Sequence, residues 1–144
     1  MRIKILLIGD DPVSLLADGQ LLKERGLMVF STFNLQNIDE LINEVGPDLL
    51  FFDPRKSNNP INEVYNRIIN GSNFNNLPII FTLSDDDVYL VTRKRTDSKE
   101  KKNIIADNII DALKMALRSY KTYQRKTHKL PNQDINFPNH IALA

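Results

Sequence analysis

The stretch "LLFFDPRK", residues 49–56, joins four large apolar residues directly to an aspartate and a proline. A short run in which every residue is apolar is typical of a strand buried on both faces, as in a parallel sheet. Pro54 then favours a turn, because proline contributes no backbone N–H to a sheet. Asp53 is therefore expected at the end of a buried strand, which is an unusual place for a charge.

Apolar runs and helical patterns alternate on both sides of this stretch. Asp11 is a suitable N-cap for the first helix, with Pro12 at the first helical position and Gly26 at its end. The alternation of strands and helices predicts an α/β domain whose parallel sheet has helices on both faces. The expected strands are 3–8, 27–31, 48–52, 78–83 and 86–94, and further helices are expected over 38–46, 61–71 and 106–126, the last capped by Asp107.

The composition restricts the class of protein. A length of 144 residues suits one domain, which we place at residues 1–126, followed by a tail or linker remnant over 127–144. The net charge of +1 does not draw the chain toward nucleic acid or a membrane, and no apolar run approaches the length of a bilayer span. The absence of cysteine excludes disulfides and thiolate metal sites and fits a cytoplasmic protein.

Three carboxylates follow two of the expected strands. Asp10 and Asp11 come after the first strand and Asp53 after the third, and ligands of such sheets bind beyond the carboxyl ends of the strands. Clustered carboxylates repel one another, and Mg²⁺ is a common reason to keep them together. A carboxylate beside such an ion can attack phosphorus and form an aspartyl phosphate. Two simpler interpretations stay open: Asp53 only begins the turn with Pro54, and Asp11 only caps the first helix.

The chain resembles the receiver domain of bacterial two-component response regulators over residues 2 to about 126. The resemblance rests on "ILLIGDDPVSLL" (5–16), "PDLLFFD" (47–53), "LPII" (77–80) and the order of elements. It implies a flavodoxin-like, doubly wound parallel sheet of five strands in a three-layer α/β/α arrangement. It also implies phosphorelay signal transduction, in which a sensor histidine kinase or a phosphotransfer protein phosphorylates the receiver.

The resemblance assigns a role to each candidate site residue. Asp53 is the expected phosphoacceptor. The expected Mg²⁺ ligands are Asp10, Asp11, Asp53 and the backbone carbonyl of Arg55, and the phosphoryl group is expected to contact Thr82 or Ser84 and either Lys94 or Lys102.

The sequence departs from the family pattern in three places. Gly9 replaces the first acid of the usual acidic run, and the guanidinium of Arg55 is able to occupy the metal site. Residues 85–105 match poorly: helix four is nearly deleted, strand five is atypical, and residues 95–102 are too polar for a buried strand. These departures support an alternative, a pseudo-receiver that is never phosphorylated and acts as a protein–protein interaction module.

The expected partners follow from the same resemblance. The family uses the surface of helix four, strand five and helix five for output and dimerisation, so a downstream protein and a second copy of the chain are both expected partners. The basic run 93–102 has no interleaved aromatic residues, which disfavours nucleic acid as a partner. Only five glycines are present and none has phosphate-binding spacing, which disfavours a nucleotide-binding protein.

Overall fold

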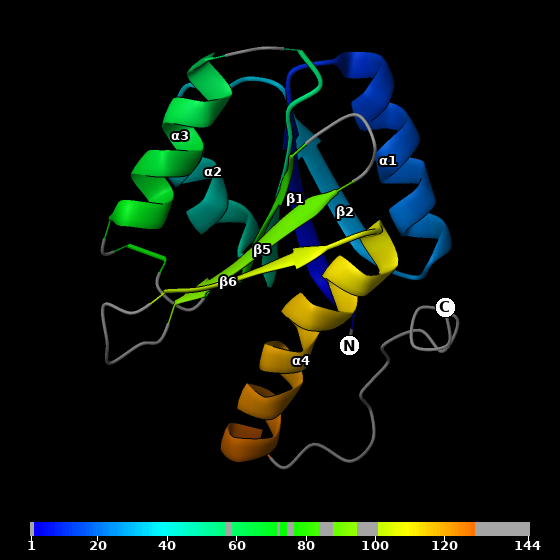
Figure 1. Cartoon of the computed structure of the whole chain (residues 1–144), viewed down its shortest axis with the longest axis vertical. Helices are drawn as coiled ribbons and strands as arrows, with labels where there is room; N and C mark the ends of the chain where they lie inside the picture. The colour runs from blue at the N-terminus through cyan, green and yellow to red at the C-terminus, as the bar shows by residue number, and fades with distance from the viewer. Residues whose placement is uncertain are drawn as a thin grey trace.

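The computed structural model describes residues 2–56, 59–71, 73–74, 77–83, 88–94 and 101–128. Within these residues the chain is an α/β fold with six strands and four helices (Figure 1). The elements in chain order are β1 Lys4–Gly9, α1 Pro12–Glu24, β2 Met28–Thr32, α2 Ile38–Val45, β3 Leu49–Asp53, α3 Asn59–Asn70, β4 Ile79–Thr82, β5 Tyr89–Lys94, β6 Lys101–Ala106 and α4 Ile109–His128.

The sheet is mixed, with the strand order β2-β1-β3-β4-β5-β6. The first four strands in this order are parallel, whereas β5 is antiparallel to β4 and β6 is antiparallel to β5. The prediction of five parallel strands is therefore wrong in both number and direction. The physical reason is the short connection after β4, because a parallel return needs a crossover of about a dozen residues or more. The chain instead turns back at once, and Leu83 N–H donates to the carbonyl of Val88 at 2.8 Å.

The sixth strand begins within the polar run 95–102, whose composition does not favour a buried strand. It lies at the edge of the sheet, where only one neighbour pairs with it, so polar side chains can stay in water. Lys102 and Asn103 are exposed, whereas Ala106 is buried against α4. Polarity excludes a buried central strand but not an edge strand, which is the position that β6 takes.

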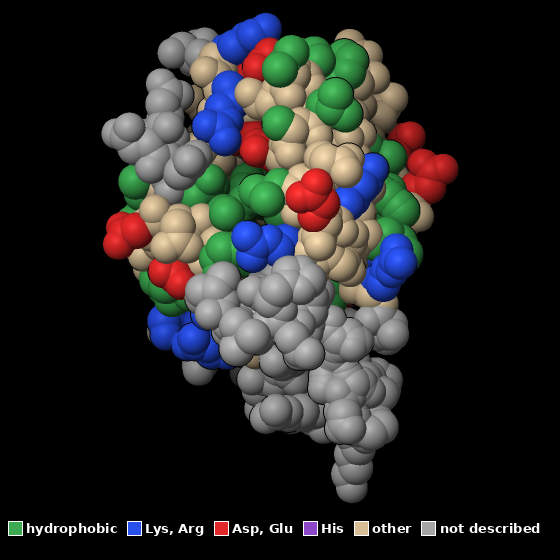
Figure 2. All heavy atoms as spheres, turned by 90° about the vertical axis from the view of Figure 1, so that its right-hand side faces the viewer, with side chains coloured by type: hydrophobic (Ala, Val, Ile, Leu, Met, Phe, Trp, Pro, Cys, Tyr) green, Lys and Arg blue, Asp and Glu red, His purple; other side chains and the backbone are tan. Residues whose placement is uncertain are grey.

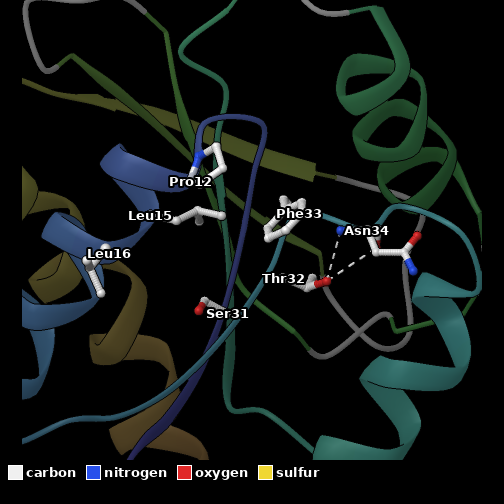
Figure 3. A pocket seen from close by; sticks show the side chains of 7 residues that line it. All are labelled: Pro12, Leu15, Leu16, Ser31, Thr32, Phe33 and Asn34. Atoms are coloured by element: carbon white, nitrogen blue, oxygen red, sulfur yellow. Dashed lines mark hydrogen bonds between the residues drawn. The ribbon is translucent and has the colours of Figure 1, made fainter.

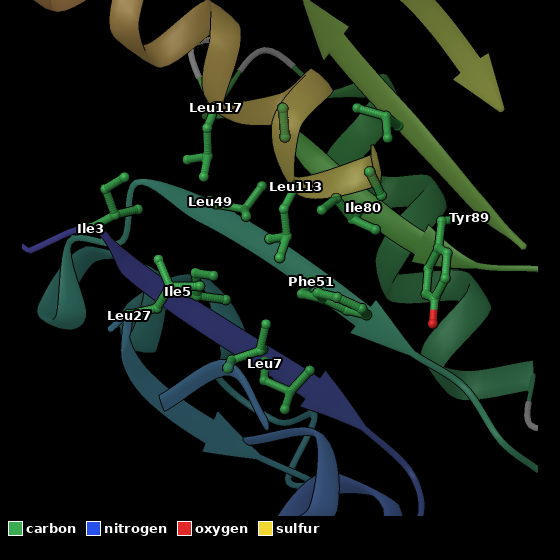
Figure 4. Packing of buried hydrophobic residues seen from close by; sticks show 14 of the residues in the cluster. Ile3, Ile5, Leu7, Leu27, Leu49, Phe51, Ile80, Tyr89, Leu113 and Leu117 are labelled. Atoms are coloured by element: carbon green, nitrogen blue, oxygen red, sulfur yellow. The ribbon is translucent and has the colours of Figure 1, made fainter. Parts of the chain in front are cut away.

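Helices cover both faces of the sheet, so the predicted three layers are present. Alternate residues of β1 and β3 point to opposite faces and enter two separate cores. One core, drawn in Figure 4, packs Leu7 and Phe51 against α1 and α4 and includes Tyr89 of β5. The other packs Leu6 and Phe52 against α2 and α3.

Two helix caps test the predicted helix starts. Asp11 caps α1 as expected, because its Oδ2 accepts a hydrogen bond from Ser14 N at 3.3 Å and from Ser14 Oγ at 2.7 Å. The predicted cap of the last helix is wrong: Asn108, not Asp107, accepts from the backbone N–H of Asp111 at 2.9 Å. α4 continues to His128, two residues beyond the boundary expected at 126.

Among the described helices, none combines the length and apolarity that crossing a membrane requires.

Candidate functional site

The carboxyl ends of β1, β3 and β4 meet at one edge of the sheet, and this edge holds the candidate site. The parallel register pairs Gly9 with Asp53 and Phe52 with Phe81. Asp53 therefore lies beside Thr82, the last residue of β4, and near Asp10, which follows β1. The register thus brings the ends of β1 and β3 together, as expected for Asp10 and Asp53, and adds Thr82 from β4.

Asp53 is the centre of the site and is only 1% exposed. Its Oδ1 accepts a hydrogen bond from Thr82 Oγ1 at 3.1 Å and lies 2.9 Å from Nε of Arg55. Its Oδ2 is buried and has no hydrogen-bond partner in the part of the chain that the structure describes. One oxygen of the carboxylate is thus held by a hydroxyl and a cation, and the other is buried without a described hydrogen-bond partner.

Arg55 joins Asp53 to a second acid, Asp18 on α1. A terminal guanidinium nitrogen of Arg55 lies 3.4 Å from Oδ2 of Asp18, and the side chains of Arg55 and Asp18 are 22% and 18% exposed. One cation therefore lies between two carboxylates that come from different elements. This Asp53–Arg55–Asp18 cluster carries one net negative charge when all three groups are ionised.

The surroundings of Asp53 change its protonation. Burial, followed by the neighbouring carboxyl of Asp18, raises the pKa of Asp53 to about 7, although Arg55 and the Thr82 hydroxyl act in the opposite direction. Burial opposes the charge on Arg55, but Asp53 and Asp18 outweigh it, and the pKa of Arg55 is raised. Arg55 therefore stays a cation, while Asp53 is partly protonated near neutral pH.

Asp10 and Asp11, the two acids after β1, both have structural partners. Asp10 Oδ1 accepts hydrogen bonds from the backbone N–H groups of Arg55 at 2.8 Å and Lys56 at 3.3 Å, which holds the loop after β3. Asp11 caps α1, which favours the simpler of its two interpretations. In the described ranges no three acidic or histidine side chains are placed to hold a metal ion. Asp10 and Asp11 are thus engaged within the chain, and the Mg²⁺ roles of Asp10, Asp11, Asp53 and the Arg55 carbonyl stay predictions.

Gly9 stands where the family pattern has an acid, and the packing around it accounts for this departure. A Cβ atom at this position would lie 2.9 Å from Cγ and 2.8 Å from Cδ2 of Leu15, and 3.2 Å from the carbonyl oxygen of Asp53. Leu15 of α1 thus fills the space into which a side chain at position 9 would project. The missing acid at Gly9 is therefore matched by a local packing change, and it cannot be restored without moving α1 or Leu15.

The two candidate lysines lie at the opposite end of the strands from Asp53 and Thr82. β5 runs antiparallel, pairing Tyr89 with Thr82 at its start, so Lys94 lies five residues away, or about 16 Å along the strand. Lys102 pairs with Arg93 and shares that distant end. The contact of Lys94 or Lys102 with a phosphoryl group on Asp53 stays a prediction, and the direction of β5 does not favour it. Ser84, the alternative hydroxyl to Thr82, lies outside the described residues.

Asp18 is the site residue that the sequence reasoning missed. It lies three residues after Leu15 and four before Leu22, and both of these leucines are buried on the sheet-facing side of α1. A charge on the buried stripe of a helix needs a partner, so this spacing was the available signal.

A shallow pocket of about 280 Å³ lies beside the site, between the start of α1 and the end of β2 (Figure 3). Its lining residues are Pro12, Leu15, Leu16, Ser31, Thr32, Phe33 and Asn34. Val13, Leu16 and Phe33 around it are exposed hydrophobic residues. Figure 2, which faces the α1 side, shows hydrophobic side chains at the surface among charged ones. A pocket of this volume is small for a nucleotide or flavin, and the exposed apolar side chains suit contact with a protein.

Comparison of the sequence with models of known protein families found no match, and comparison with curated proteins found none either. Among solved structures, the fold is similar to crystal structures of two variants of HypX from Aquifex aeolicus. The first is 10% identical with a TM-score of 0.42, and covers 88% of this chain but 28% of that chain. The second is 12% identical with a TM-score of 0.41, and covers 85% and 27%. Similarities this weak carry no inference about function.

Proposed function

We propose that this chain is a receiver-like domain of two-component signal transduction that works without phosphorylation, as a protein–protein interaction module. The observation that carries the proposal is the 2.9 Å contact between Arg55 Nε and Asp53 Oδ1. The order β2-β1-β3-β4 with helices on both faces supports the flavodoxin-like part of the resemblance.

Arg55 supplies the positive charge that a metal ion would otherwise bring to Asp53. Phosphoryl transfer requires cations beside the oxygens of the transferred group. In the described part of the chain, Asp10 is engaged by backbone N–H groups, and both candidate lysines lie at the far end of the strands. The groups that would stabilise an aspartyl phosphate are thus replaced by an internal ion pair.

The protonation of Asp53 supports the same proposal. A neutral carboxyl is a much weaker nucleophile than a carboxylate, and the pKa of Asp53 is raised to about 7, first by burial and then by Asp18. Near neutral pH a substantial fraction of the molecules therefore holds a proton at this site. The cluster is better suited to fixing α1 against the loop after β3 than to accepting phosphate.

A phosphorylated receiver is the second candidate, and one specific observation favours it. Asp53 Oδ2 is buried without a described hydrogen-bond partner, while Thr82 donates to the other oxygen from the neighbouring strand. In this candidate Arg55 leaves the carboxylate, a sensor histidine kinase or phosphotransfer protein phosphorylates Asp53, and Mg²⁺ assists. A downstream protein partner is common to both candidates.

The test is the intact mass of the protein after incubation with Mg²⁺ and acetyl phosphate. We expect no phosphoryl group on the wild type or on Asp53→Asn, with circular dichroism confirming that both are folded. A phosphoryl group on the wild type but not on Asp53→Asn would overturn the proposal in favour of the second candidate. Arg55→Gln tests whether the ion pair prevents phosphorylation. A phosphoryl group on this variant but not on the wild type would show that Arg55 protects Asp53.

A further inference from the structure

The outer edge of β6 ends the sheet, and no described element lies beyond it. In an edge strand, the backbone N–H and C=O of every second residue point away from the neighbouring strand and are not used in the sheet. Ile105, on this strand, is 53% exposed, which is high for a large aliphatic side chain. Both features suit pairing with another strand.

The ladder between β4 and β5 determines which backbone groups face outward. The bond from Leu83 N–H to the Val88 carbonyl marks this pair as a hydrogen-bonded one. Hydrogen-bonded and non-bonded pairs alternate in an antiparallel ladder, so the Phe81–Leu90 pair is bonded as well. The residues on either side of Leu90 therefore direct their backbone groups away from β4, toward β6.

The same alternation extends to β6. The residues that flank Leu90 pair with Ile104 and Ala106, so these two use their backbone groups inside the chain. Asn103 and Ile105 then direct their N–H and C=O groups outward from the sheet.

We propose that a second copy of this chain pairs with the outer edge of β6, antiparallel and about a two-fold axis at Ile104. This register places Asn103 of one copy opposite Ile105 of the other, so the outward-facing groups meet as a hydrogen-bonded pair. Ile104 then lies opposite its own copy at a non-bonded position. The two six-stranded sheets become one continuous sheet with an isologous interface.

The charges at the two ends of β6 complement one another in this arrangement. In this register position 101 of one copy, a lysine, lies opposite position 107 of the other copy, an aspartate. The two-fold axis produces this pair twice. Asp107 is exposed and is not the cap of α4, so its carboxylate is available for this contact. The antiparallel direction also keeps the two basic hairpin ends, each containing positions 93, 94, 101 and 102, at opposite ends of the joined strands. A parallel pairing would bring these like charges together.

Three single cysteine variants of the full-length chain test the register, because the sequence contains no cysteine of its own. In Ile104→Cys the two Cα atoms across the axis would lie about 4.5 Å apart, within the range of a disulfide. In the matched controls Asn103→Cys and Ile105→Cys the two identical positions would lie about 8 Å apart, beyond that range. We expect oxidation to yield a cross-linked dimer for Ile104→Cys and little for either control. Equal cross-linking of all three, or none at position 104, would overturn the proposal.

The mass in solution and a charge swap test the interface without oxidation. Light scattering after size exclusion should give twice the 16.6 kDa chain mass at high concentration. Lys101→Glu or Asp107→Lys alone should raise the dissociation constant roughly ten-fold through two like-charge contacts, and the double variant should recover most of this loss. A wild type that stays monomeric at every concentration, or single variants that dimerise like the wild type, would contradict the proposed pairing.

Discussion

The parallel half of the sheet, β2-β1-β3-β4, and the antiparallel hairpin β5–β6 follow different physical rules. The parallel strands are joined by helices, buried on both faces, and end together at the edge that holds Asp53. The hairpin pairs antiparallel with β4, contributes Tyr89 and Val91 to the core, and ends at β6, beyond which no described element lies. The difference teaches that connection length sets strand direction, and that strand direction decides which side chains reach the site.

The largest expected effect lies in the parallel half. Phe52→Ala should lower the free energy of unfolding by about 3–5 kcal/mol, because it leaves a cavity under α3. Phe52 is fully buried and its ring lies 5.5 Å from that of Tyr65 and 6.5 Å from that of Phe81. Urea denaturation followed by circular dichroism measures the change. A loss below about 1 kcal/mol would mean that this half is not the main source of stability.

Arg55→Ala should cost about 2 kcal/mol, because it leaves the buried Asp53 without its cation and only protonation of Asp53 relieves the loss. The matched control is Arg67→Ala, which removes a more exposed ion pair with Asp39 at 2.7 Å and should cost less than about 1 kcal/mol. Asp53→Asn in the same background should recover part of the loss of Arg55→Ala, which a double-mutant cycle in urea detects. Equal costs for the two arginine variants would place Arg55 outside any buried cluster.

The stability of the chain should depend on pH through Asp53. Its pKa is raised from 3.8 to about 7 in the folded chain, first by burial and then by Asp18. Between these two values the folded state binds more protons than the unfolded state. The contribution of Asp53 to the free energy of unfolding therefore falls as pH rises, and it reaches its lowest value above about pH 7. Asp53→Asn should flatten most of this dependence, because an amide does not titrate in this range. Urea midpoints of both proteins from pH 4.5 to 7.5 measure it, and parallel curves would exclude Asp53 as the group responsible.

Ile105→Ala, in the hairpin, is expected to have the smallest effect. Its side chain is largely in water, so the free energy of unfolding of the single chain should change by less than about 0.5 kcal/mol. The measurement needs low protein concentration, where pairing between copies does not contribute. A loss comparable to that of Phe52→Ala would show that the hairpin edge is covered within the chain.

Sequence reasoning predicted the parallel half well and the hairpin poorly. Apolar runs and caps are local signals, and they placed β1, β3 and the start of α1 within about a residue of their observed positions. The position of Asp53 at a strand end followed from "LLFFDP" alone. The direction of β5, and with it the position of Lys94, depends on how a short loop lets the chain return. The hydrophobic periodicity of a segment does not indicate the direction in which the segment joins the sheet.

The sequence by itself determined the order of the elements as far as β4, the burial of β1 and β3 on both faces, and the carboxyl at the end of β3. These features depend on hydrophobic spacing and on backbone chemistry that each segment carries with it. Only the tertiary structure decided that Arg55 lies between Asp53 and Asp18, that Leu15 fills the space beside Gly9, and that β6 is the last strand of the described sheet. Those features arise where segments distant in the chain meet, and their energies depend on distances between side chains that no single segment specifies.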